Sequence, residues 1–279
     1  MNFAVAEAFE LVRTEGDPDE PFQAGSLSKP VAAYAALRLV EAGELELDRD
    51  VNECLVSWQL PDGEGVTLRR LLTHTAGLGV PFFPGFEEGA ELPTLVEVLD
   101  AVRVESSPGE FRYSGGGYVL VQLLLEDVTG RRFANLAREL VFEPLGMTRS
   151  TFEQRAGRRY PEQAAAGLWT TARDLALFVG ALQRYPAMQA PQVELPPDGE
   201  WSVVAQLGMV VPSEFCLAGM LVDGWFGHLG GAHERFSAYF GSREGGQAIV
   251  ASGPQGEAPK LFAAVLAAAD ERGWKGLAA

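Results

Sequence analysis

Residues 30–42 constrain the fold most strongly, because they are apolar on nearly every side of a helix. The apolar side chains of this segment are Val31, Tyr34, Leu37, Leu39 and Val40. Gly43 follows and is typical of a helix end. A helix without a polar face must be buried, so other elements have to surround it. The 279 residues suffice for that core, as one large domain or as two coupled ones.

The flanking patterns change character along the chain. Residues 2–13 alternate loosely, which predicts one or two strands before the first helix. Helical periods dominate from about 67 to 145, and an amphipathic helix over about 258–272 is expected to cover a sheet. That antiparallel sheet is predicted from short β-like runs at 201–211, 215–222, 236–240 and 247–251.

Charge and composition exclude several classes of protein. Twenty-two basic and 38 acidic residues give a net charge of −16, which disfavours binding to nucleic acid or to an anionic membrane. No apolar run reaches the roughly 18 to 20 residues of a membrane span. The N-terminal residues lack the basic start of a secretory signal, so we expect a cytoplasmic, soluble protein.

Ser26 and Lys29 stand three residues apart at the entrance to the buried helix, in the sequence Gly-Ser-Leu-Ser-Lys-Pro. This spacing places a hydroxyl and an amine on one helical face. A lysine buried at a helix start has a lowered pKa and can deprotonate a serine nucleophile. The alternative is that Ser26 or Ser28 only caps the helix. The chain has just three lysines, so chance seldom produces such a pair.

Two further segments carry candidate chemistry. Tyr113 lies in a loop ending in Ser-Gly-Gly-Gly, where it could direct its phenol at Ser26 and act as acid or base. His228 begins His-Leu-Gly-Gly between predicted strands, where the glycines would permit an exposed strand edge. The alternatives are a packing tyrosine and a half-exposed strand histidine. His74, which precedes a glycine at a predicted helix end, is interpreted as a structural cap of carbonyl groups.

Sequence motifs that are typical of other reaction types are absent. The sequence contains no Gly-x-Ser-x-Gly, no His-Glu-x-x-His, no P-loop and no Gly-x-Gly-x-x-Gly. We therefore expect neither a metal nor a cofactor.

Ser-x-x-Lys, Tyr-Ser-x and His-x-Gly, in this order, resemble the class C-like branch of the serine β-lactamase and penicillin-binding-protein superfamily. The stretches around Ser26, at 71–78, at 142–148 and at 167–175 are similar to recurrent segments of that branch. The resemblance covers roughly residues 20–250. It implies an α+β fold, an α/β sandwich whose antiparallel sheet is flanked by helices and interrupted by an all-helical domain. We expect the sheet domain at 1–45 and 165–279, the helical insertion at 46–164 and the active site between them.

The resemblance also implies a role for each candidate residue. Ser26 would be the acylated nucleophile, Lys29 its base and Tyr113 the proton shuttle. His228 would replace the lysine of the Lys-Thr-Gly strand motif. The oxyanion would be held by backbone N–H groups of Ser26 and Gly231. Gly115 and Gly230 are the remaining expected substrate-binding positions.

One departure bears on the substrate. Gly115 stands where the family usually has an asparagine that binds the amide of a β-lactam or peptide. We therefore expect a serine hydrolase that acts on esters or small amides. A β-lactamase or D-alanyl-peptide hydrolase, and a catalytically silent binding protein, are the alternatives. The expected partner is a small-molecule ester, amide or β-lactam, and a homo-oligomer remains open.

Overall fold

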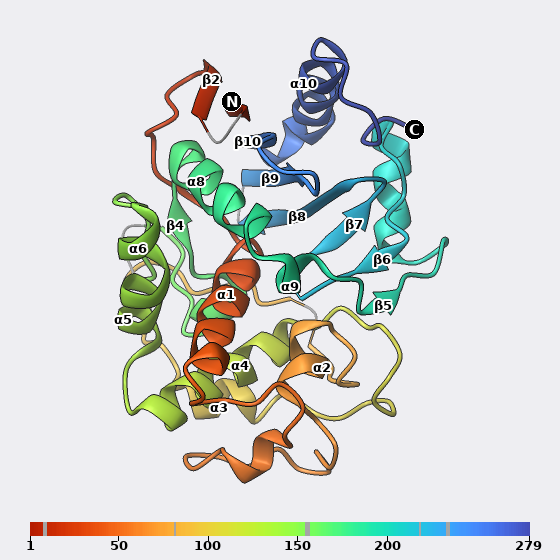
Figure 1. Ribbon diagram of the computed structural model, residues 1–279. Helices are drawn as coiled ribbons and strands as arrows, with labels where there is room; N and C mark the ends of the chain where they lie inside the picture. The colour runs from red at the N-terminus through yellow and green to blue at the C-terminus, as the bar shows by residue number, and fades with distance from the viewer. Residues whose placement is uncertain (8–9, 81, 154–156, 218, 233–234) are drawn as a thin grey trace. The chain divides into compact units, whose positions relative to one another are not determined.

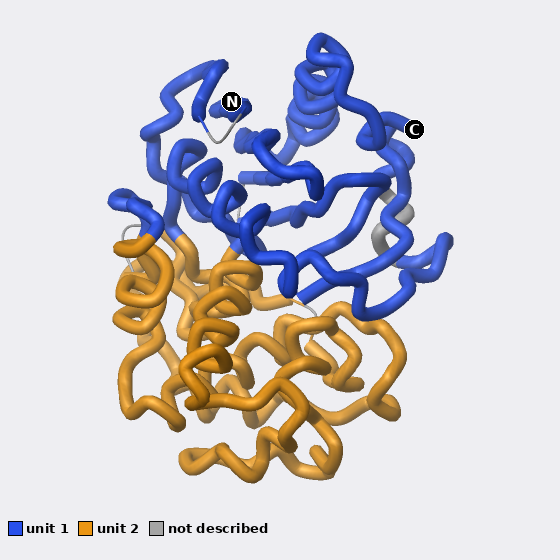
Figure 2. The backbone as a smooth tube through the Cα atoms, viewed as in Figure 1, with its two compact units in different colours: residues 1–27, 145–150, 169–279 blue, residues 28–144, 151–168 orange. Residues whose placement is uncertain are grey.

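The structure is a computed structural model (Figure 1) and describes residues 1–279 except 8–9, 81, 154–156, 218 and 233–234. The chain forms two compact units, coloured separately in Figure 2. The first unit contains residues 1–27, 145–150 and 169–279, and the second contains residues 28–144 and 151–168. No helix of the described residues has the length and apolar character needed to cross a membrane.

The first unit is built on an eight-stranded antiparallel sheet of order β2-β1-β10-β9-β8-β7-β6-β5. Its strands are β1 (Asn2–Glu7), β2 (Glu10–Glu15), β5 (Val193–Glu194), β6 (Glu214–Phe215), β7 (Met220–Val222), β8 (Trp225–Ala232), β9 (Arg235–Ser242) and β10 (Ala248–Pro254). The N-terminal hairpin joins the C-terminal strands through β1 and β10, where Val5 pairs with Ile249. Both ends of the chain therefore contribute to one sheet, as the sequence predicts.

Two helices cover opposite faces of this sheet. Phe178 of α8 (Ala172–Gln183) contacts Tyr239 of β9, whereas Phe262 of α10 (Ala258–Asp270) contacts Phe236 of the same strand. Side chains three residues apart on a strand point to opposite faces. The α+β architecture with helices on both faces is thus confirmed, and α10 covers the sheet as its periodicity predicts.

Short elements complete the first unit. β3 (Phe22–Gln23) pairs with β4 (Trp169–Thr170) in a separate two-stranded sheet, directly before the segment that carries Ser26. The other short elements are α9 (Pro186–Gln189), η3 (Glu200–Leu207) and η4 (Gln255–Glu257).

The second unit is helical and is built around α1 (Ser28–Glu41), which packs against α4 (Gly115–Thr129), α5 (Phe133–Ala137) and α7 (Gln163–Ala166). Ten of the 14 residues of α1 are buried, so the predicted buried helix is confirmed. Arg38 and Glu41 form an exposed ion pair at its end. The remaining elements are η1 (Val51–Glu53), α2 (Leu68–Leu72), α3 (Leu95–Leu99), the π-helical turn η2 (Arg138–Phe142) and α6 (Glu143–Leu145). The last residue of α6, Leu145, already belongs to the first unit.

Two expectations about strands are wrong. Residues 201–211 were expected to be β-like, but η3 is a 3₁₀ helix that ends at Gly208, whose φ of 78° stops the helix in the left-handed region. Within it, Val204 is buried and the next two residues, Ala205 and Gln206, are both exposed, which is not the alternation of a strand. Residues 215–222 form no single strand, because the Cys216 N–H donates to the Gly219 carbonyl and turns the chain between β6 and β7.

The unit boundaries also differ from the expected domain ranges. We expected residues 1–45 to stay with the sheet, but the first unit gives way to the second at residue 28. The reason is packing: α1 packs most extensively against α4, α5, α7 and η2, all of which are helical elements of the second unit.

Candidate active site

The segment that carries Ser26 lies tightly against β8 in the first unit. Gly25 has a φ of +52°, and a Cβ placed there would come within 2.2 Å of the Gly231 carbonyl oxygen. A Cβ on Gly230 would lie 2.1 Å from the carbonyl oxygen of Ala24. Only glycines allow two backbones to approach this closely. The geometry therefore fixes the half-buried Ser26 next to the end of β8 that carries Gly231.

This contact is possible because β8 extends beyond β7, its neighbour in the sheet. The pairing of β7 with β8 ends where Met220 meets Gly227, so among the described strands residues 228–232 are paired only on the β9 side. The open side of β8 receives the Ala24–Gly25 backbone instead. No described strand pairs with the β8 edge at these glycines, as the sequence predicts, but the Ala24–Gly25 backbone covers this edge.

His228 of β8 is buried, with 1% of its surface exposed, which rules out a half-exposed strand histidine. Its Nδ1 lies 2.7 Å from the carbonyl oxygen of Leu229. A carbonyl can only accept a hydrogen bond, so Nδ1 carries the proton. In the neutral ring Nε2 is then the hydrogen-bond acceptor. His228 can therefore accept a proton or a hydrogen bond at Nε2 but holds no permanent charge, unlike a lysine.

Lys29 is the central group of the second unit. It belongs to the first turn of α1, is 2% exposed, and its Nζ donates a hydrogen bond of 2.9 Å to the carbonyl oxygen of Ala165. The same Nζ lies 5.0 Å from the centre of the Tyr113 ring and 5.8 Å from that of Tyr118. Burial lowers the pKa of Lys29 from 10.5 to about 7. At neutral pH much of this amine is therefore unprotonated and able to act as a base.

His74 packs against Tyr113 and holds the loop that carries it. The two ring centres lie 4.4 Å apart, and the Ser114 N–H donates to Nδ1 of His74 at 3.1 Å. His74 has a φ of +58°, which is unusual for a residue other than glycine. The sequence predicts a cap of carbonyl groups at His74, whereas its Nδ1 accepts a hydrogen bond from the Ser114 N–H. The contact with the tyrosine loop was missed because His74 and Tyr113 are 39 positions apart in the sequence.

The tyrosine loop enters α4 through a well-formed helix start. Ser114 caps the helix by accepting from the Gly117 N–H at 3.1 Å, and its hydroxyl donates to the Gly79 carbonyl at 2.7 Å. Gly115 is the first helical residue and is buried. A Cβ on Gly116 would lie 2.8 Å from the Gly79 oxygen, so the glycine run serves close packing.

Sequence reasoning also missed a buried carboxylate, Glu162. It is 1% exposed, and neither carboxylate oxygen has a hydrogen-bond partner among the described residues. Burial raises its pKa from 4.5 to about 7. Glu162 begins the turn of α7 that supplies the Ala165 carbonyl to Lys29. Its surroundings come from tertiary packing, and no local sequence pattern signals them.

The candidates thus form two groups. The first unit holds Ser26, His228, Gly230 and Gly231, and the second holds Lys29, Tyr113 and Gly115. Ser28 also belongs to the second group, where its hydroxyl accepts from the Leu168 N–H at 2.9 Å.

An antiparallel sheet with helices on both faces, a serine segment on a strand edge and a buried lysine beside a tyrosine define the fold class of the penicillin-binding proteins and serine β-lactamases. The sequence profile of the family described as Beta-lactamase matches residues 5–273. The chain belongs to this family, as the motifs predict.

Individual relatives support the assignment. Penicillin-binding protein 4 of Amycolatopsis lactamdurans is 33% identical over 137 residues, which are 47% of this chain and 36% of that protein. Esterase EstB of Burkholderia gladioli is 34% identical over 147 residues, 46% of this chain and 38% of the esterase. The chain thus matches a little more than a third of the length of these relatives. The solved D-amino acid amidase from Ochrobactrum anthropi SV3 shares the fold, with a TM-score of 0.76 at 20% identity over 97% of this chain and 93% of the amidase.

Proposed function

We propose that the chain is a serine hydrolase that forms an acyl-enzyme on Ser26 and acts on esters or small amides. The observation that carries this proposal is Lys29, an amine buried at a helix start whose pKa is lowered to about 7 by burial. An alcohol becomes a competent nucleophile only when a neighbouring base takes its proton. A neutral amine three residues from a half-buried serine supplies such a base.

The proposed acylation begins when Ser26 Oγ attacks the carbonyl carbon of the substrate while Lys29 Nζ accepts the hydroxyl proton. The oxyanion formed would be held by the backbone N–H groups of Ser26 and Gly231. Its collapse breaks the bond to the leaving group, which takes a proton from the Tyr113 hydroxyl. Lys29 then returns a proton to Tyr113. The products of this step are the acylated Ser26 and the free alcohol or amine.

Deacylation would follow the reverse order with water. Tyr113 passes its hydroxyl proton to neutral Lys29 and accepts a proton from the attacking water, whose oxygen bonds to the acyl carbon. The bond between the acyl carbon and Ser26 Oγ then breaks, Lys29 Nζ returns a proton to Ser26 Oγ, and the acid is released. His228 would accept a hydrogen bond from the substrate through Nε2, since its Nδ1 donates to the Leu229 carbonyl.

A second candidate, penicillin recognition, is favoured by the relative from Amycolatopsis lactamdurans, whose name describes a penicillin-binding protein. Gly115 speaks against it, because a glycine has no side-chain amide with which to bind a β-lactam.

Covalent labelling separates the candidates. The intact chain is incubated with a fluorophosphonate or with benzylpenicillin, and adducts are mapped by peptide digestion, with Ser26→Ala as control. We expect an adduct on Ser26 from the fluorophosphonate that is absent in Ser26→Ala. A second adduct from benzylpenicillin would favour the penicillin-binding alternative. No adduct from either reagent would refute the hydrolase proposal and favour a silent binding protein.

A further inference from the structure

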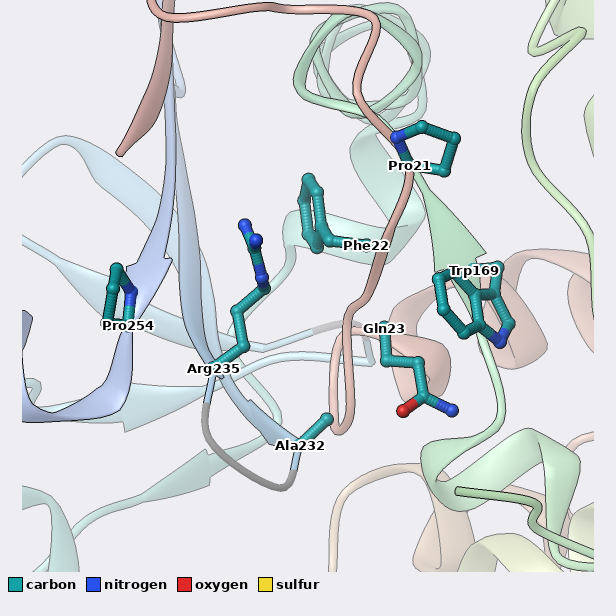
Figure 3. Close-up of a pocket in the computed structure, with 7 residues that line it drawn as sticks. All are labelled: Pro21, Phe22, Gln23, Trp169, Ala232, Arg235 and Pro254. Carbon is teal, nitrogen blue, oxygen red and sulfur yellow. The ribbon is translucent and has the colours of Figure 1, made fainter. Parts of the chain in front are cut away.

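A pocket of the first unit lies beside the strands that flank the Ser26 segment (Figure 3). It has a volume of about 370 Å³. Its lining residues are Pro21, Phe22, Gln23, Trp169, Ala232, Arg235 and Pro254. The walls are thus largely apolar and aromatic, and they contain one permanent positive charge, that of Arg235. Figure 3 shows the Arg235 side chain extending from β9 toward Phe22.

Among the described residues, the carboxylate paired with the Arg235 guanidinium lies beyond hydrogen-bond distance. Its Nη2 lies 4.0 Å from Glu20, its Nη1 donates a long hydrogen bond of 3.4 Å to Ser252 Oγ, and its carbon lies 5.7 Å from the centre of the Phe22 ring. Glu20 is held elsewhere, because Asn2 Nδ2 donates to its other oxygen at 2.6 Å.

Arg173 of the same unit provides the contrast. Its Nε and Nη2 donate to the two oxygens of Asp19 at 2.8 and 3.0 Å. This is the paired geometry that a guanidinium favours. Arg235 carries the same five donors, and most of them are not used by the described residues. A ligand carboxylate in the pocket could occupy them as Asp19 occupies those of Arg173.

The pocket is adjacent to the segment that bears the proposed nucleophile. Gln23 precedes Ser26 by three residues, which span at most about 11 Å even when fully extended. Ala232 directly follows Gly231, whose carbonyl lies against Gly25. The pocket wall at Gln23 and at Ala232 therefore belongs to the two segments whose backbones meet beside Ser26.

We propose that this pocket binds a carboxylate carried by the substrate, so that the preferred esters or amides bear an acidic group on an aromatic or other apolar body. This proposal rests on the hydrolase function proposed above. Arg235 would bind the carboxylate in a bidentate manner, while Phe22 and Trp169 supply aromatic surface. The chain carries a net charge of −16 and repels anions at long range. Binding of an anionic substrate thus requires a local cationic site of this kind.

The first test compares two probes that differ only in charge, hippurate and its uncharged amide, by titration calorimetry. We expect the wild-type chain to bind hippurate at least about tenfold more tightly than the amide. Arg235→Gln should abolish this preference, and Arg235→Lys should keep part of it. The ion-paired Arg173→Gln, the matched control, should retain it. If the wild-type chain bound the two probes with equal affinity, or bound neither, that result alone would overturn the proposal.

The second test follows the rate of fluorophosphonate labelling of Ser26. Hippurate should slow labelling in the wild-type chain and in the control Arg173→Gln, and it should not slow labelling in Arg235→Gln, each rate being compared with that of the same chain without hippurate. Hippurate that binds without slowing the labelling would contradict a substrate pocket. Absence of labelling in the wild-type chain would instead refute the hydrolase function. The two proposals thus fail by different results.

Discussion

The side-chain amine of Lys29 donates a hydrogen bond of 2.9 Å to the main-chain carbonyl of Ala165, a residue 136 positions further along the chain. The carbonyl is neutral, so it fixes the position of the amine without supplying the negative charge that would keep it protonated. Burial lowers the pKa of Lys29 to about 7. An amine that a carbonyl group holds in place and whose pKa is lowered in this way suits a base.

The first prediction concerns the pH dependence of acylation. Below pH 7 Lys29 is an ammonium ion and cannot accept the Ser26 proton, because its pKa in the folded chain is about 7. The rate constant for fluorophosphonate labelling of Ser26 should therefore rise about tenfold per pH unit below 7 and level off above it. Stopped-time labelling with mass detection between pH 5 and 9 measures this. A rate independent of pH would contradict Lys29 as the base.

The second prediction removes the amine. Lys29→Met keeps a long apolar side chain in the buried position and should lower the labelling rate by about 10² to 10⁴-fold, the usual contribution of a general base. Lys260→Met is the matched control, because Lys260 is exposed and pairs with Glu257. Labelling of Lys260→Met should equal that of the wild-type chain. Equal rates in both variants would show that the buried amine takes no part.

The third prediction concerns Glu162 and stability. Its pKa is 4.5 in the unfolded chain and about 7 in the folded one, so the folded chain binds more protons between these values. The free energy of unfolding should therefore fall as pH rises from 4.5 to 7, by about 3 kcal/mol in total. Glu162→Gln has no carboxyl group to ionise at this position, so its free energy of unfolding should not show this fall. The variant should therefore be more stable than the wild-type chain at pH 8, but not at pH 4.

Urea unfolding of both chains at several pH values tests this prediction, with the exposed Glu91→Gln as matched control. Other buried acids, such as Asp174, whose pKa burial also raises, affect both chains alike and cancel in the difference. An increase in stability at pH 8 shared by Glu91→Gln would reflect only the reduction of net negative charge.

The long elements of the fold follow from the sequence, since their patterns agree with their surroundings. The helix α1 is apolar on nearly every side and largely buried, α10 has an amphipathic period with a matching buried face, and β9 and β10 are short runs buried on both faces. The incorrect predictions concern short elements. Residues 201–211 are rich in β-forming side chains, yet residues 201–207 belong to a 3₁₀ helix, so the local preference does not decide the structure there.

The site is predictable only where chemistry needs a fixed local spacing. Ser26 and Lys29 share one helical entrance and stand out in the sequence. The partner of Lys29 does not, because the Ala165 carbonyl is a backbone atom supplied by a distant turn. Glu162 and Arg235 were missed for a similar reason: their properties arise from burial and from unused donors, which only the tertiary contacts reveal.

The fourth prediction tests His74 as a positioning residue for the tyrosine loop. His74→Leu would leave the buried Ser114 N–H without the acceptor at Nδ1, which costs about 1 to 3 kcal/mol. His74→Asn retains an acceptor oxygen and tolerates the φ of +58°. Urea unfolding should therefore place the asparagine variant closer to the wild-type chain. The Ser26 labelling rate should fall in both, because Tyr113 loses its ring contact. Equal stability of the two variants would contradict this role.

The fifth prediction concerns the contact between Gly25 and β8. Gly25→Ala would place a Cβ within 2.2 Å of the Gly231 carbonyl oxygen and force the Ser26 segment away from β8. Gly43→Ala is the matched control, because Gly43 has a φ of +75° but nothing within 4 Å. The control bears only the left-handed backbone cost of about 1 to 2 kcal/mol. Thermal unfolding should show a larger loss for Gly25→Ala, and mass spectrometry should show Ser26 labelling lost in that variant alone. Retained labelling in Gly25→Ala would mean that acylation does not depend on this contact.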